Sequence, residues 1–310
     1  MYGFKTIVLS RKGFDSTAGY GYSPFDPETG KYIVLPIPDG EIGNYPGNGT
    51  KYEEIEIQPE YLPGIAASNL RDLIRAKPLG FRNNTKKAIA EKYAHLDPWL
   101  GPCPWLNEKS NHSIGALGQI GAAQGHLSNN NVEKGSLFLF FSRFTPVKDR
   151  NNSIGITIDT QKGAYFLYGW LKVGRVISDF DHISNQELRS SHPHATKGYF
   201  DREKHNTIYV ADGLLFREPP IPGCGYFPRL SKKLLLTSDK HCETPSIWEL
   251  PSFFSKDPPT YFSRKPEAWS PESNKTHIVK APARGQEFVF RENKELCIWF
   301  KDLIGEMIGQ

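Results

Sequence analysis

The sequence predicts a single α+β domain over residues 1–310, with a mixed, largely antiparallel sheet and flanking helices. Three observations support this fold class. Several β-branched or apolar runs are bounded by glycine, proline and polar residues, as strands are. One segment near the end of the chain repeats its apolar residues with the period of a helix. No internal repeat and no low-complexity linker divides the chain.

The strands are predicted from two kinds of pattern. Residues 5–10 carry a β-branched run, and residues 136–141 form an unbroken apolar run typical of a buried strand. Residues 136–177 as a whole predict an antiparallel meander. The predicted strands are 5–10, 32–38, 136–141, 154–158, 164–177 and 206–211.

Helices are predicted from capping residues and apolar periodicity. Residues 68–74 begin with a capping signal, and residues 85–93 place lysines on their exposed side. Residues 246–269 are rich in proline and aromatic residues without a period, which predicts irregular packing over the core. The closing helix, 294–307, places four apolar residues on one face: Leu296, Trp299, Phe300 and Leu303.

Composition limits the function classes only loosely. The net charge of +4 is compatible with nucleic-acid binding without requiring it. The 4 cysteines form no Cys-x-x-Cys pair, which argues against a structural zinc site. We find no signal peptide and no apolar run long enough to span a membrane, so we expect a cytoplasmic protein with reduced thiols.

Residues 118–128 combine small side chains with two amides and an imidazole, those of Gln119, Gln124 and His126. Small residues let a backbone approach a ligand closely, and amides pair with the edges of nucleobases. The alternative is a small-residue helix packed on the strand that follows, with the amides capping loops. Spacing alone leaves both interpretations open, because the segment is not a phosphate-loop pattern.

A polar loop follows the first predicted strand, and loops at strand ends are common places for a site. Arg11 and Lys12 suit phosphate binding, and Ser16 adds a hydroxyl. Asp15 is the strongest candidate in this loop for an acid, a base or a group that stabilises a cation. The alternative is a surface turn in which Asp15 bonds its own backbone.

Three further pairs of polar residues are candidates for the same site. His95 and Asp97 could share a site, although Asp-Pro is also an ordinary turn. His192 and His194 lie two apart, but no third metal ligand has telling spacing, so a contact to substrate or phosphate is the preferred interpretation. The last pair opens a late strand, where Arg284 beside Glu287 is either an ion pair or part of a site that includes Gln286.

Taken together and in chain order, these motifs resemble the third nucleotide-modification-associated domain family, described as DNA base hypermodification proteins. The resemblance runs from about residue 5 to about residue 305. It implies action on modified bases in DNA, often in phages or in defence against them, and it does not fix a reaction. The motifs are residues 10–16, 35–38, 95–98, 118–127, 192–194, 206–211 and 284–288.

Residue chemistry narrows the reaction. No nicotinamide, flavin or nucleoside-triphosphate fingerprint is present, and neither a hydrolase nucleophile motif nor a zinc-deaminase motif occurs. We therefore expect no cofactor and no metal. Isolated carboxylates, amides and histidines fit cleavage of a glycosidic bond, where positive charge develops on the sugar.

The hypothesis is a DNA glycosylase that flips a modified base, including a glucosylated one, and cleaves its bond to the sugar as an anti-phage defence. The catalytic carboxylate is Asp15, with Glu287 or Asp97 as the substitute. The amides of Gln119, Gln124 and Gln286 contact the base or its attached sugar. The imidazoles of His126 and His194 contact the leaving group or a phosphate, and the cations Arg11, Lys12 and Arg284 contact the DNA backbone.

Two other functions remain open on the sequence alone. A transferase that installs part of a hypermodification predicts a donor-dependent gain of mass in DNA. A non-catalytic reader of modified bases predicts salt-dependent binding that survives Asp15→Asn. The exact base, the strand preference and the oligomeric state do not follow from the sequence.

Overall fold

The structure is a computed structural model. It describes residues 4–14, 19, 21–39, 49–62, 65–76, 89–107, 112–147, 158, 162–256, 269–273, 275–281, 287–291 and 293–309. Several predicted features lie wholly or partly outside the described residues, namely residues 154–157 of the strand at 154–158, residues 85–88 of the helix at 85–93, and the candidate site residues Asp15, Ser16, Arg284 and Gln286.

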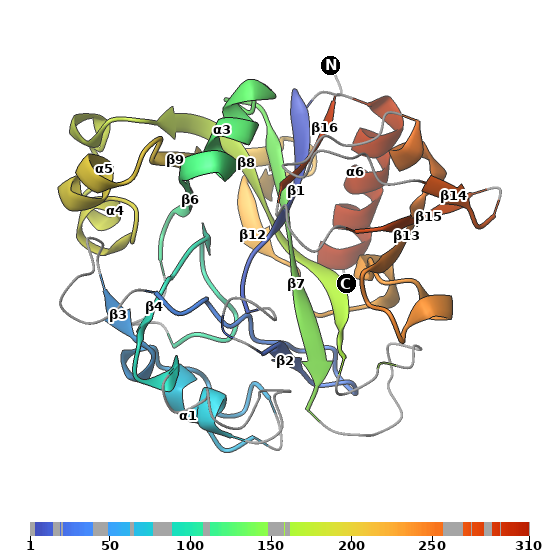
Figure 1. The fold of residues 1–310 in the computed structure, drawn as a ribbon, viewed down its shortest axis with the longest axis horizontal. Coiled ribbons are helices and arrows are strands. Elements are labelled where there is room, and N and C mark those ends of the chain that lie inside the picture. Colours follow the sequence, from blue (N-terminus) through green and yellow to red (C-terminus); the bar gives the residue numbers. More distant parts are fainter. Residues whose placement is uncertain are drawn as a thin grey trace.

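Within the described part of the chain, the core is a nine-stranded sheet (Figure 1). Most neighbouring strands are antiparallel, whereas β1 and β2 each run parallel to β7, so the sheet is mixed and largely antiparallel, as predicted. The strand order is β16 (Glu287–Arg291), β1 (Thr6–Arg11), β7 (Leu137–Pro146), β8 (Ala164–Ile177), β9 (Thr207–Ala211), β6 (Gly115–Gln119) and β5 (Trp99–Leu100), with β2 (Ser23–Phe25) on β7 and β12 (Cys224–Tyr226) on β8.

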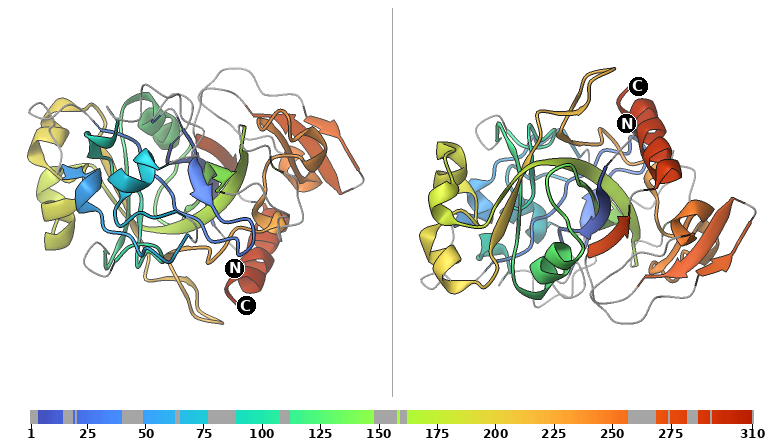
Figure 2. Two further views of the ribbon diagram at one scale, coloured as in Figure 1. Left: turned by 90° about the horizontal axis from the view of Figure 1, so that it is seen from below. Right: turned by 90° about the horizontal axis from the view of Figure 1, so that it is seen from above.

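The predicted meander is confirmed in β7 and β8, which form the longest pairing of the sheet. Nine of the ten residues of β7 are buried, as its apolar run indicates. A bulge lies between Phe140 and Phe141, and β8 curves strongly across the molecule (Figure 2). The curvature brings distant strands together, so that Gln119 at the end of β6 contacts Glu287 at the start of β16.

Helices cover the two sides of this sheet (Figures 1 and 2). The helices α4 (Gln186–Ser191) and α5 (Lys197–Arg202) lie beyond β9 and β6, and α6 (Lys294–Ile308) lies on the opposite side. The predicted closing helix is therefore confirmed as α6. Its Leu296, Phe300 and Leu303 are buried, while Trp299 is partly buried against the core.

The remaining elements are short. They are α1 (Leu70–Arg75), the helix predicted at 68–74, α3 (Gly121–Asn129), and the strands β3 (Thr50–Lys51), β4 (Tyr93–Ala94), β10 (Leu214–Phe216), β11 (Ile221–Pro222), β13 (Ile247–Pro251), β14 (Trp269–Pro271) and β15 (Thr276–Lys280), with 3-10 turns at Tyr52–Glu54, Phe180–His182, Lys232–Leu234, Asp239–His241 and Ser252–Ser255. None of the helices among the described residues has the length and apolar character needed to cross a membrane.

Two predictions about secondary structure were wrong. Residues 32–38 form only isolated bridges at Tyr32 and Pro38, because the prolines at 36 and 38 have no N–H to donate to a ladder. Residues 247–251 form the strand β13, which pairs with β15 rather than packing irregularly. Local pattern could not show this strand, because its partner lies about 30 residues further along the chain.

Candidate functional site

Polar side chains gather in one cavity, of about 200 Å³, where β1 and β6 end. A larger groove of about 610 Å³ lies beside β12. Among its described lining residues, Asp212 is the one charged side chain, and it already forms an ion pair with Lys172. Charged and ionisable side chains are therefore concentrated in the first cavity. Its walls are formed by Arg11, Lys12, Gly13, Ile37, Asp39, His95, Asp97, Gly118, Gln119, Ile120, His194 and Tyr199.

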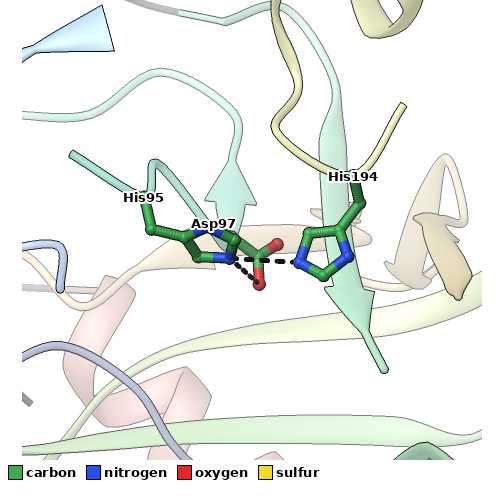
Figure 3. A group of neighbouring side chains, drawn as sticks. All are labelled: His95, Asp97 and His194. Carbon is green, nitrogen blue, oxygen red and sulfur yellow. Dashed lines mark hydrogen bonds and ion pairs between the residues drawn. The ribbon is translucent and has the colours of Figure 1, made fainter. Parts of the chain in front are cut away.

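Three of these residues, His95, Asp97 and His194, point toward one another (Figure 3). The Nε2 atoms of His95 and His194 are 3.0 Å apart. The Nε2 atom of His95 is 4.0 Å from Oδ2 of Asp97. We call these three residues the His–Asp–His cluster. Two imidazoles and one carboxylate are groups that can move protons or bind a metal.

The three residues come from two loops. His95 and Asp97 follow β4 and precede β5, and His194 lies between α4 and α5. The strand β6 passes directly beneath His194 at Gly118. A Cβ atom at Gly118 would lie 2.1 Å from the His194 ring, so only glycine leaves room for the imidazole.

Each residue of the cluster also has a polar contact with a neighbouring residue outside the cluster. The Nδ1 atom of His95 contacts the carboxylate of Asp39, and Nδ1 of His194 lies 2.8 Å from Oδ1 of Asn206. The backbone N–H of Gly118 donates to Oδ1 of Asp97 at 2.7 Å. These partners fix the orientation of the cluster before any ligand binds.

The charges in the cluster are set by burial and by close neighbours. Burial disfavours the charged form of Asp97, but the hydrogen bond from His192, together with the nearby His194 and Lys12, outweighs it and holds the pKa of Asp97 well below its usual range. Burial and the neighbouring His95 lower the pKa of His194 to about 3. Near pH 7, Asp97 is therefore a carboxylate and His194 a neutral imidazole.

A second polar group lies behind Lys12 and Gln119. Oε1 of Glu287 accepts from the hydroxyl of Ser10 at 3.2 Å, lies 3.6 Å from Nζ of Lys12, and contacts Nε2 of Gln119. Glu287 is 1 % exposed, and burial raises the pKa of its carboxyl despite these contacts. Its Oε2 atom has no hydrogen-bond partner among the described residues.

Sequence reasoning found part of this site. Among the predicted site residues, the cavity brings together Arg11, Lys12, Asp97, Gln119 and His194. Glu287 adjoins the cavity through Lys12 and Gln119 without lining it.

The two predicted residues on α3 lie elsewhere. Gln124 is buried, donates to Ser128 at 3.0 Å and accepts from the Tyr209 hydroxyl at 3.1 Å. His126 contacts Asn130 one helical turn later. Neither residue lines the cavity, so the structure matches the alternative of a small-residue helix for residues 121–129.

Sequence reasoning named His95 only as a residue that could share a site with Asp97, and it gave no role to Asp39, Tyr199 or Asn206. The one available signal was the pair of two-residue spacings, His95 with Asp97 and His192 with His194. The chain separates His95 from His194 by 99 positions, so nothing local shows that the two pairs meet.

Comparison with known proteins supports a nucleotide-related role. No curated protein matches the chain, and no solved structure matches it either. The family described as nucleotide modification associated domain 3 matches residues 6–291, which include every described residue of the cavity. The chain belongs to the nucleotide modification associated domain 3 family.

Proposed function

We propose that this protein is a DNA glycosylase that removes a modified base from DNA by hydrolysing the bond between base and sugar. The observation that carries the proposal is the cavity itself, which places the His–Asp–His cluster beside the cations Arg11 and Lys12. Membership of a family associated with nucleotide modification makes a nucleotide in DNA the preferred substrate.

The proposed reaction needs an activated water and a stabilised sugar cation. Water adds to C1′ of the deoxyribose, the bond from C1′ to the base nitrogen breaks, and the base leaves with that electron pair and takes up a proton. Positive charge develops on the sugar as the bond breaks, so an ionised carboxylate nearby lowers the barrier. Asp97 meets these needs, because it is ionised and lies on the cavity wall, whereas the carboxylate of Asp39, also on the wall, contacts the ring of His95. The cluster as a whole activates the water.

The cavity also supplies groups for binding. Arg11 and Lys12 suit the phosphates that flank a flipped nucleotide, because phosphate contacts position a protein on DNA. Ile37 and Tyr199 give the cavity apolar surface for a base. The amide of Gln119 bonds Glu287 and the N–H of Ile120 in the described structure, so we assign it to shaping the wall rather than to reading the base.

Flipping a base out of a duplex costs a few kcal/mol, and contacts in the pocket repay this cost. The resemblance of the chain to base-hypermodification proteins implies modified bases, often those of phages, as the substrates of the proposed reaction. We therefore assign the proposed activity to defence against phages with modified DNA.

The proposal is tested by incubating the protein with phage DNA that carries sugar-decorated cytosine and with unmodified DNA of the same sequence. We expect abasic sites, detected with an aldehyde-reactive probe, in the modified DNA only. Asp97→Asn abolishes them, whereas His182→Ala, at an exposed histidine outside the cavity, leaves them unchanged.

Three outcomes would overturn the proposal. If correctly folded wild-type protein leaves the modified DNA unchanged, the protein has no glycosylase activity on it. A donor-dependent gain of mass without abasic sites assigns a transferase. Tight binding that survives Asp97→Asn, with no change in the DNA, assigns a non-catalytic reader.

A further inference from the structure

The His–Asp–His cluster brings three candidate ligand atoms close together. The candidate atoms of His95, Asp97 and His194 all lie within 4.8 Å of one another (Figure 3). Ligands bound at about 2.1 Å and at right angles around one metal ion are about 3.0 Å apart, which follows from ordinary metal–nitrogen distances. The 3.0 Å separation of the two Nε2 atoms matches this geometry.

The hydrogen bonds behind the cluster decide which ring nitrogens carry protons. The amide of Asn206 donates through Nδ2 to the backbone carbonyl of His194 at 2.9 Å, so its Oδ1 faces the His194 ring as an acceptor. Nδ1 of His194 must then be the donor. A neutral His194 therefore has a lone pair, and no proton, on Nε2.

The same reasoning applies to His95. Its Nδ1 atom contacts the carboxylate of Asp39, and a carboxylate can only accept, so Nδ1 carries the proton. When the ring is neutral, Nε2 of His95 therefore also carries a lone pair. Two lone pairs face each other at 3.0 Å, with a carboxylate oxygen alongside. This arrangement is repulsive unless a cation lies between them.

The partners of the cluster are those that metal sites use. Histidine ligands commonly donate their second N–H to a carboxylate or a carbonyl oxygen, which fixes the ring and raises its basicity. The carboxylate of Asp39 accepts this bond from His95, and Oδ1 of Asn206 accepts it from His194. The carboxylates of Asp39 and Asp97 also supply two negative charges, which balance a divalent ion.

We infer that His95, Asp97 and His194 bind one divalent transition-metal ion on the wall of the cavity. Two imidazoles and one carboxylate favour Fe²⁺, Mn²⁺ or Zn²⁺ over Mg²⁺ and Ca²⁺, which prefer oxygen ligands. Three protein ligands leave positions open toward the cavity, as in catalytic rather than structural sites. A metal-bound water has a lowered pKa and would be the nucleophile of the proposed reaction. The inference shares its site with the proposed function but does not need that reaction.

Metal binding is measurable without any substrate. Protein without an affinity tag is treated with a chelator, dialysed and titrated with Co²⁺, followed by calorimetry and by the visible absorption of the bound ion. We expect one Co²⁺ per chain, displaced by Zn²⁺ and not by excess Mg²⁺. His95→Ala and His194→Ala lose the binding and the absorption, and the exposed control His182→Ala keeps both.

The variant Asp39→Asn tests the residue that holds the His95 ring, without removing a metal ligand. It keeps the shape of the side chain and weakens the hold on His95, so we expect Co²⁺ affinity to fall by about 10-fold to 100-fold. Circular dichroism establishes that each variant is folded. His95 is partly exposed, so its replacement is the least disturbing of the three ligands.

The inference is overturned if wild-type protein binds none of Co²⁺, Zn²⁺ and Mn²⁺ in a one-to-one ratio. It is equally overturned if folded His95→Ala and His194→Ala bind Co²⁺ as wild type does. In both cases a shared proton, not a metal, joins the two imidazoles. Stoichiometric metal binding without base release supports the metal site and argues against the glycosylase. Base release by a protein that binds no metal supports the glycosylase and overturns the metal site.

Discussion

Gly118 supports the imidazole of His194 from below, and a Cβ atom at this position would lie 2.1 Å from the ring. The same residue donates its backbone N–H to Asp97 at 2.7 Å. One position in β6 thus contacts two members of the His–Asp–His cluster. This relationship gives a steric reason for a glycine at position 118, although α3 does not line the cavity.

We expect Gly118→Ala to destabilise the protein and displace His194. Overpacking in a buried site costs roughly 1–3 kcal/mol. Urea denaturation measures the loss of unfolding free energy, and the Co²⁺ titration reports whether the cluster is disrupted.

The matched control is Gly125→Ala in α3, where a Cβ atom meets nothing within 4 Å. Alanine is favoured over glycine in a helix by up to about 1 kcal/mol, so this variant should be as stable as wild type or more so. Equal stability of the two variants would contradict the steric role of Gly118.

Glu287 makes stability depend on pH in a direction opposite to that of most carboxylates. Burial raises the pKa of its carboxyl above the ordinary value of 4.5. The native state therefore keeps this proton at pH values where the unfolded state has lost it. Stability from this group is fully present below the unfolded pKa and is lost as the pH rises through the folded pKa.

The comparison with Glu287→Gln isolates this effect. Glutamine cannot ionise, so the difference in unfolding free energy between wild type and the variant should move in favour of the variant as the pH rises from about 4 through the acidic range. Urea denaturation at a series of pH values measures it. A difference that stays constant with pH would show that Glu287 ionises normally in the folded protein.

Lys12 has a structural and a binding role that can be separated. Lys12→Gln leaves the Glu287 carboxylate buried without its cation, 3.6 Å away in the wild type. Breaking a buried pair costs on the order of 3 kcal/mol, reduced here because Glu287 can take up a proton. The double variant Lys12→Gln/Glu287→Gln removes both charges and should recover stability.

The double variant should recover stability but still bind DNA more weakly than wild type, because it lacks the Lys12 cation. If Lys12 contacts a phosphate, both variants weaken DNA binding and lower the slope of log affinity against log salt by about 1. Lys275→Gln, at an exposed lysine beside β15, should change neither the slope nor stability. An unchanged slope in the double variant would place Lys12 in the structural role alone.

The sequence alone determined the elements whose pattern is local. The apolar run of β7, the β-branched run of β1 and the one-sided apolar face of α6 each predict a buried surface from residues within a few positions of one another. The mixed sheet followed from these elements, because strands with such faces are buried only by pairing and by helical cover. The ordered motifs also identified the family.

Only the tertiary structure decided the site. His95 and His194 stand 99 positions apart, and Asp39, Gly118 and Asn206 come from three further segments. Each of these residues alone is compatible with an ordinary turn or a packed core. The fold brings them together at one wall of the cavity or directly behind it, and the direction of each hydrogen bond determines which ring nitrogens carry lone pairs. No local pattern encodes either property, because both depend on contacts between segments that the chain keeps far apart.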